Sequence, residues 1–380
     1  MPDLRECNRA VRSLVYYITA HGYGHGVRST DIIRFLIRTY PGIPVVIVSD
    51  LPRSFLRNRL PGLRFEYRSA SLDTGMVQID SIRVDVDRSL EKALDLHRSW
   101  KRLVDREAEF LSRRRAGAVV VDIPAIPLEA AARIGISGLA VSNFGWDWIY
   151  AEFTGRNSAW QTVVEAFAAG YSTARLLLRL PFHEEMSAFP SIEDIPLVSA
   201  AGSDRRREIA EITGCDPQRR WILLSFTTLD WDARALGTIE SIRGYEFFTV
   251  LPLAWELQNV HALDRERVSF TDIVASVDAV ISKPGYGIVS DCVVNRKPLI
   301  YAERSDFREY GILEEAIGKY LRSVRIPADD LYRGDLLKSL ETIWEAPESS
   351  CAMSHGGEKI AARRIVELGP WLLPSSEAGA

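Results

Sequence analysis

The stretch that most restricts the possible folds is residues 279–301, AVISKPGYGIVSDCVVNRKPLIY. A short apolar run leads into the turn KPGYG, which is followed by a segment with helical periodicity and by a second apolar run after Pro298. A strand, a loop, a helix and another strand in this order form a crossover unit of a parallel sheet. The stretch therefore predicts an α/β fold.

The turn of this unit also predicts a phosphate site. Gly285 and Gly287 allow backbone N–H groups to approach a ligand, and the start of the helix adds a partial positive charge. Lys283 supplies a cation beside the turn, and Asp291, farther along the helix, can accept hydrogen bonds from ribose hydroxyls. Ser290 replaces the third glycine of the dinucleotide fingerprint, so an ordinary tight turn is the alternative interpretation.

Length and composition indicate a cytoplasmic protein of two or three domains. The chain has 380 residues, of which 47% are hydrophobic and 26% are charged, as in soluble globular proteins. Its apolar runs are shorter than the roughly 18 residues that span a bilayer, and the N-terminus lacks the apolar region of a signal peptide. The four cysteines form no CxxC pair, which favours free thiols over a zinc site or a disulfide framework.

The net charge of −4 hides a basic N-terminal region. Residues 1–68 contain eleven arginines and no lysine against five acidic residues. A solvated surface is one interpretation, and an anionic partner, such as a phosphorylated acceptor or a membrane contacted peripherally, is the other. A nucleic-acid partner is not expected, because aromatic residues are not interleaved with these arginines and the chain contains no recognised nucleic-acid module.

Apolar runs alternate with helical segments along most of the chain, which predicts two doubly wound α/β domains. Residues 71–86 interrupt the pattern and are expected to form an irregular loop. The predicted boundaries are a first domain at 1–195, a second domain at 196–355, a helix within 356–373 that packs back on the first domain, and a disordered tail at 374–380. Strands are predicted at 14–19, 45–48, 118–121, 139–141, 221–226, 246–251, 279–282 and 299–301, and a long amphipathic helix at 87–115.

Several polar residues directly follow predicted strands. His21 and His25 follow the first strand, Asp122 follows a later one, and Thr227 and Thr228 follow a strand of the second domain. Ligands of open α/β sheets bind at the carboxyl ends of strands. Two such domains facing each other would form one cleft, with a phosphate site on one wall and an acid/base group on the other.

Longer segments resemble a known family. In order along the chain they include HGYGHGVRS, DTGMVQIDSIRVD, VVVDIP, VSNFGWDWIYAEF, RLPFHEEMSAF, KPGYGIVSD and ERSDFREY. They resemble GT-B glycosyltransferases, which have two Rossmann-like domains, and more narrowly the N-terminal, glycosyltransferase-like half of plant L-arabinokinase and its bacterial relatives. The galactokinase-type half of arabinokinase has no counterpart in these 380 residues, so the resemblance does not imply sugar kinase activity.

On the donor side, the resemblance implies a nucleotide-sugar site. It assigns Lys283 to the phosphate, Gly285 to the turn and Asp291 to the ribose. Arg304 and Glu309 fall in the region of the family's acid–glutamine pair for the donor sugar, and since that pair is missing the sugar cannot be named. The full predicted donor set is Thr227, Thr228, Phe270, Lys283, Gly285, Tyr286, Gly287, Asp291, Arg304 and Glu309.

On the acceptor side, the resemblance makes His25 the general base and Asp122 the carboxylate that orients it. A histidine near neutral pKa can take the proton of an attacking hydroxyl, and a carboxylate on its other ring nitrogen fixes the tautomer. Neither a cofactor nor a metal is expected, because Lys283, threonine hydroxyls and a helix N-terminus would compensate the charge of the leaving diphosphate. The residues predicted to contact acceptor are His21, Arg28, Trp146 and Asp147. A core position is the alternative for Trp146.

The predicted function is transfer of a sugar from a UDP-sugar to a hydroxyl of a small molecule, a glycan or a lipid-linked acceptor, with inversion and without a metal. Two alternatives remain open. A nucleotide-sugar 2-epimerase would release UDP with no acceptor present. A non-catalytic nucleotide-sugar sensor would bind the donor without turnover.

Overall fold

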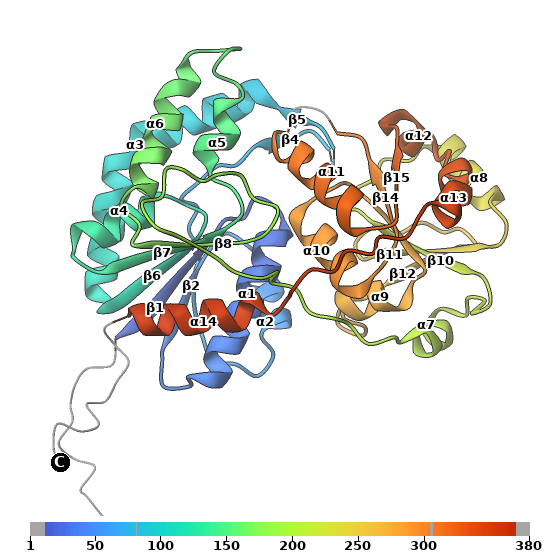
Figure 1. The fold of residues 1–380 in the computed structure, drawn as a ribbon, viewed down its shortest axis with the longest axis horizontal. Coiled ribbons are helices and arrows are strands. Elements are labelled where there is room, and N and C mark those ends of the chain that lie inside the picture. Colours follow the sequence, from blue (N-terminus) through green and yellow to red (C-terminus); the bar gives the residue numbers. More distant parts are fainter. Residues whose placement is uncertain (1–11, 81, 305–306, 370–380) are drawn as a thin grey trace, which may run out of the picture. The chain divides into compact units, whose positions relative to one another are not determined.

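The protein forms two compact units in a computed structural model that describes residues 12–80, 82–304 and 307–369. Within that range, the first unit contains the chain up to Gly75, Ser89–Ile195 and the chain from Gly357 onward. The second unit contains Met76–Arg88 and Pro196–Gly356. The predicted α/β class is confirmed for both units (Figure 1).

The first unit is built on a seven-stranded parallel sheet in the order β3-β2-β1-β6-β7-β8-β9. Its central strands are nearly continuous apolar runs, because helices cover both faces of a parallel sheet and leave no solvated side. The strands are β1 (Ser13–Ile18), β2 (Val45–Val48), β3 (Glu66–Arg68), β6 (Ala116–Asp122), β7 (Ser137–Ser142), β8 (Leu176–Arg179) and β9 (Ile192–Asp194). The helices are α1 (Tyr23–Thr39), α2 (Arg53–Arg59), α3 (Val86–Arg113), α4 (Ile126–Arg133), α5 (Trp146–Ala151), α6 (Ala159–Tyr171) and α14 (Gly357–Leu368).

The second unit is built on a six-stranded parallel sheet in the order β12-β11-β10-β13-β14-β15. The stretch that predicted the fold supplies β13 (Ala279–Ser282), α10 (Tyr286–Asn295) and β14 (Leu299–Ala302), and β13 and β14 are adjacent. The other strands are β10 (Arg220–Ser225), β11 (Tyr245–Val250), β12 (Val260–Leu263) and β15 (Ser323–Ile326). The other helices are α7 (Arg206–Thr213), α8 (Ala233–Ser241), α9 (Phe270–Ser276), α11 (Glu309–Tyr320), α12 (Ala328–Arg333) and α13 (Leu337–Glu345).

Residues 76–88 differ from the sequence prediction in both structure and location. Part of the expected loop is a short antiparallel hairpin of β4 (Val77–Gln78) and β5 (Val84–Asp85), and the segment packs with the second unit although it lies within the first 195 residues. Its turn is closed by Asp80, whose carboxylate accepts the backbone N–H groups of Ile82 and Arg83 at 2.8 Å each. Ile82 is 3% exposed and belongs to the hydrophobic core of the second unit.

The C-terminal helix α14 packs on α1 within the first unit (Figure 1). Arg364 fixes it with an ion pair to Glu193 at 2.8 Å. The predicted tail at 374–380 lies outside the described residues. Within the described part of the chain, no helix combines the length and apolarity needed to cross a membrane.

Candidate active site

The first unit brings His25 and Asp122 together. Strand β1 ends at Ile18, and Gly22, with a left-handed φ of 84°, turns the chain into α1, so that His25 lies in the first turn of the helix. Asp122 is the last residue of the adjacent strand β6, in register with Ile18. Nδ1 of His25 lies 2.7 Å from Oδ1 of Asp122. The pairing expected from the sequence is therefore present.

Asp122 is fully buried and is the centre of a charged network. Arg28 binds both of its oxygens, with Nε 2.7 Å from Oδ2 and Nη2 2.6 Å from Oδ1, and the hydroxyl of Ser29 donates to Oδ2 at 2.8 Å. Burial by itself would raise the pKa of Asp122, but Arg28 and His25 outweigh it and hold that pKa well below its usual range. The carboxylate is therefore ionised at neutral pH.

The tautomer of His25 decides what its outer nitrogen can do. Nδ1 lies 2.7 Å from a carboxylate oxygen of Asp122 and 2.9 Å from Nη2 of Arg28. If Nδ1 donates to Asp122, Nε2 carries a lone pair and can accept a proton; if Nδ1 accepts from Arg28, Nε2 carries the proton. The shorter contact is the one to the carboxylate, and it favours the tautomer that a general base requires.

Arg28 does not have the role predicted for it. It is 3% exposed, and its guanidinium is used within the protein: besides Asp122, it donates to Oδ1 of Asn143 at 2.8 Å and to Oγ of Ser142 at 3.2 Å. The prediction of an acceptor contact is corrected, because these bonds already occupy the side chain. Arg28 instead fixes the carboxylate that holds His25.

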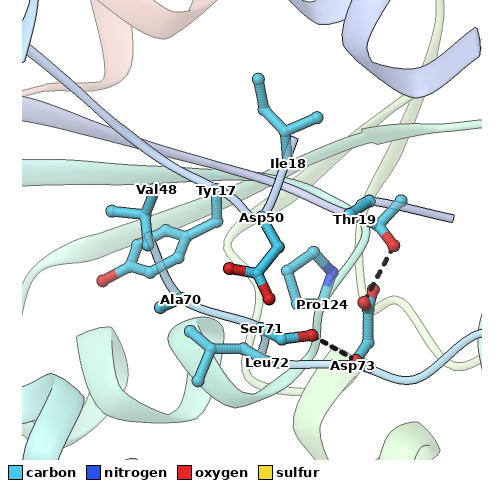
Figure 2. Close-up of a pocket in the computed structure, with 11 residues that line it drawn as sticks. Tyr17, Ile18, Thr19, Val48, Asp50, Ala70, Ser71, Leu72, Asp73 and Pro124 are labelled. Carbon is cyan, nitrogen blue, oxygen red and sulfur yellow. Dashed lines mark hydrogen bonds between the residues drawn. The ribbon is translucent and has the colours of Figure 1, made fainter. Parts of the chain in front are cut away.

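The sequence interpretation missed Asp73, which lies in the predicted loop. It is 6% exposed, and it accepts hydrogen bonds from the hydroxyl of Thr19 at 2.8 Å and from Nε1 of Trp146 at 3.0 Å. Burial raises the pKa of Asp73. Figure 2 shows the contact with Thr19, beside a cavity of about 10 Å³ that has room for one water and not for a sugar. The segment DTGM contained a signal for an ordered turn at Asp73, since aspartate and glycine close together in the sequence are typical of turns.

Trp146 is a core residue. Its indole is 0% exposed and its N–H is bonded to Asp73, so no ring face is open for the predicted stacking on a sugar. His21 packs edge-on against Trp146, with ring centroids 5.1 Å apart, and lies against Gly75, where a side chain would collide with its imidazole. Asp147 lies in the first turn of α5, and its carboxylate lies against Gly145, as in a capped helix start. Its predicted contact with the acceptor stays a prediction.

In the second unit, three adjacent strands end beside the predicted donor residues. Ser225 of β10 is in register with Ser282 of β13, and Ser282 with Tyr301 of β14. Thr227 and Thr228 follow β10 and are exposed, Lys283 follows β13, and Arg304 follows β14. Parallel strands end at one edge, so these side chains leave the same edge of the sheet. Helix α10 starts there at Tyr286, with Gly285 as an N-cap residue that makes no side-chain cap.

Lys283 and Arg304 are largely buried cations, and their outer nitrogens contact no partner among the residues that the structure describes. Arg304 is 8% exposed and its Nε donates to the carbonyl oxygen of Ile82 at 3.0 Å. Within the described residues, no hydrogen bond or ion pair reaches Nζ of Lys283 or the terminal nitrogens of Arg304. Burial and the nearby Arg304 lower the pKa of Lys283 to about 8, and burial lowers the pKa of Arg304 to about 10.

The other predicted donor residues occupy two environments. Asp291 is 5% exposed and accepts the hydroxyl of Ser199 at 2.7 Å, which ties the segment after Pro196 to α10; its role toward ribose stays a prediction. Phe270 begins α9, where Arg265 lies over its ring at 5.4 Å, and its role also stays a prediction. In the described ranges, no group of three histidine, cysteine or acidic side chains is arranged to hold a metal ion.

No family model matches the sequence. The chain is 30% identical over 360 residues to L-arabinokinase of Arabidopsis thaliana. The alignment covers 93% of this chain and 34% of the arabinokinase, so the chain spans about a third of that relative's length.

Solved glycosyltransferases share the fold at low sequence identity. The calicheamicin glycosyltransferase superposes with a TM-score of 0.58 at 13% identity, covering 93% of each chain. The glycotransferase of kitacinnamycin superposes at 0.60 and 13% identity, covering 95% of this chain and all of the other. The chain has the GT-B fold. A Polygonum tinctorium UDP-glucosyltransferase that glucosylates indoxyl superposes at 0.59 and 14% identity, covering 94% and 93% of the two chains.

Proposed function

We propose that the protein is a glycosyltransferase that moves a sugar from a nucleoside-diphosphate sugar, with UDP as the nucleotide, to a hydroxyl acceptor with inversion at the anomeric carbon. The observation that carries this proposal is the buried His25–Asp122 pair, held by Arg28 at the carboxyl ends of β1 and β6. A module that only bound nucleotide sugars would need no such base. The solved neighbours include a UDP-glucosyltransferase that glucosylates indoxyl, which supports the same class.

In the proposed reaction, the acceptor oxygen attacks the anomeric carbon while its proton passes to Nε2 of His25. The bond between the anomeric carbon and the diphosphate oxygen breaks, and both of its electrons leave with UDP. Asp122 keeps Nδ1 protonated and stabilises the imidazolium as it forms. The ionised state of Asp122 is suited to this role.

The second unit would bind the donor and compensate the charge of the leaving diphosphate. Lys283 supplies a cation, the start of α10 supplies backbone N–H groups and a partial positive charge, and Thr227 and Thr228 supply hydroxyls. These groups would take the place of a metal as the Lewis acid that stabilises the leaving diphosphate, so the proposed reaction is metal-independent. The carboxylate of Asp291 would accept hydrogen bonds from the ribose.

The test is release of UDP from a panel of UDP-sugars, with and without phenolic, aliphatic and glycan acceptors. We expect acceptor-dependent release by the wild type and a loss of about 10²- to 10⁴-fold in kcat/KM in His25→Ala, because general-base catalysis contributes that much. His97→Ala, in the charged helix α3, is the matched control and should retain activity. A fully active His25→Ala variant would exclude His25 as the base. Donor binding without turnover on any acceptor would show a sensor instead.

A further inference from the structure

Two cations follow neighbouring strands at the carboxyl edge of the sheet in the second unit. Lys283 is the first residue after β13 and Arg304 the second residue after β14, and these two strands are hydrogen-bonded neighbours. A single diphosphate already has Lys283, the start of α10 and two threonine hydroxyls to bind it. Arg304, one strand farther along, is an additional cation that is not required to bind the diphosphate.

The guanidinium of Arg304 is fixed in one pose. Its Nε donates to the carbonyl oxygen of Ile82, and its central carbon lies 3.8 Å from the centroid of the Phe307 ring. Ile82 belongs to segment 76–88, named the hairpin 76–88 after the β4–β5 hairpin that it contains. These two contacts hold the plane and leave both terminal nitrogens without a hydrogen bond among the residues that the structure describes. A guanidinium with this free edge is suited to a carboxylate, which it binds through two parallel N–H···O bonds.

Among the described residues, the two carboxylates near Arg304, those of Asp80 and Glu309, do not occupy this edge. Asp80 is bound by the backbone of its own turn and by the side chain of Arg83, with Nε 2.7 Å from Oδ2. Glu309, in the first turn of α11, is 5% exposed and acts on Arg304 electrostatically, and no ion pair within 4.0 Å joins them in the described ranges. A bound sugar that lacked an anionic group would cover these donors without offering them a charged acceptor, which costs binding energy.

We propose that the donor is a nucleoside-diphosphate uronic acid, whose sugar carboxylate is held by the two terminal nitrogens of Arg304 while Lys283 contacts the diphosphate. Glu309 would accept a hydrogen bond from a hydroxyl of the same sugar. This inference rests on the proposed function and adds the chemical class of the sugar. It makes Arg304 the residue that determines donor specificity, and it makes the hairpin 76–88 the element that sets the pose of Arg304.

Isothermal titration calorimetry tests the proposal with UDP, UDP-glucose, UDP-glucuronate and UDP-galacturonate on the full chain. We expect at least one uronate to bind about tenfold or more tightly than UDP-glucose, the size of one charge-assisted bidentate contact. Arg304→Gln should remove this preference and leave the affinity for UDP unchanged. Arg304→Lys keeps the charge without the planar fork and should retain only part of the preference. Arg325→Gln, whose partner is Glu303 and whose side chain is 56% exposed, is the matched control and should bind like wild type.

The outcomes separate this inference from the proposed function. Equal affinity of the wild type for UDP-glucose and both uronates would overturn the inference while leaving a UDP-sugar transferase intact. A loss of UDP affinity in Arg304→Gln as large as the loss of uronate affinity would also overturn it, because Arg304 would then be a diphosphate ligand. Failure of every nucleotide to bind the wild type would overturn both proposals. Thermal unfolding of each variant verifies that the protein still folds.

Discussion

The charged sites of the two units are built in opposite ways. In the first unit, Asp122 receives hydrogen bonds from Arg28, His25 and Ser29, so a buried charge has its partners within the protein. In the second unit, Lys283 and Arg304 are largely buried and their outer nitrogens have no described partner. The difference indicates that the first site is fixed within the protein, whereas the proposed donor site in the second unit would be completed by a bound anion.

The largest effect expected from this difference is on stability. Asp122→Ala removes the partner of a guanidinium that is 3% exposed, and breaking a buried pair on one side costs about 3–5 kcal/mol of the free energy of unfolding. Urea unfolding followed by circular dichroism measures the loss. Asp105→Ala, which removes an exposed ion pair to Arg133, is the control and should cost less than about 1 kcal/mol. Equal losses in the two variants would mean that the buried Asp122 network stabilises the fold no more than an exposed ion pair does.

The opposite result is expected for Lys283→Met. Removing a largely buried cation that contacts no partner among the described residues should leave the free energy of unfolding unchanged or slightly higher. The affinity for UDP should fall by about ten- to hundredfold, the value of a charged hydrogen bond, in calorimetric titration. Lys338→Met, on the exposed side of α13, is the control and should change neither quantity. Unaltered UDP binding by Lys283→Met would contradict the assignment of the phosphate site.

A smaller effect should appear as a dependence on pH. Because the pKa of Lys283 in the free protein is about 8, UDP affinity should be greatest below pH 8 and weaken as the amine loses its proton above it. The unfolded chain keeps that proton up to about pH 10.4, so between pH 8 and 10.4 it binds more protons than the folded protein, and the stability contribution of this group rises with pH. Lys283→Met should show neither trend. An affinity for UDP that is constant from pH 7 to 9.5 in the wild type would contradict the prediction.

The smallest predicted effect tests how rigidly the first site is held. Gly75 has a left-handed φ of 58° and its missing side chain makes room for the ring of His21, whereas Gly62 has a φ of 70° with nothing within 4 Å. Both alanine variants should lose about 1 kcal/mol through backbone strain. Gly75→Ala should lose more, because the added methyl displaces His21. In the double variant with His21→Ala, the loss of stability should fall to that of Gly62→Ala. A larger loss in the double variant would show that the added methyl destabilises the protein by another contact than the one with His21.

The sequence predicted the sheets well because a buried parallel strand has a local signature. The runs LVYYI and VVIV are apolar at every position and AVIS is apolar up to its final serine, and their strands begin and end within one or two residues of the prediction. Strand β8, inside the first sheet, and the edge strand β12 were missed. The edge strands β3, β9 and β15 were missed as well. They are only partly buried and contain charged residues such as Glu66, Glu193 and Arg325, so no apolar run marks them.

The pairing of His25 with Asp122 was also predictable, because both residues follow strands and parallel strands end at one edge. The role of Arg28 was not, since nothing in its sequence neighbourhood shows that a residue in the second turn of α1 contacts Asn143 and Asp122. Trp146 illustrates the same limit. An aromatic residue after a strand has the same local pattern whether it packs in the core or contacts a ligand, and only its burial distinguishes the two.

The hairpin 76–88 affects how this protein can be dissected or recombined. A fragment that began at residue 196 would lack Ile82, leaving a hole in its apolar interior, and would lack the carbonyl group that orients Arg304. A chimaera that joined the N-terminal half of one protein to the C-terminal half of a relative would therefore combine the hairpin of the first protein with the arginine of the second. Donor preference should follow residues 76–88 together with the C-terminal half, so the hairpin must be transplanted with it.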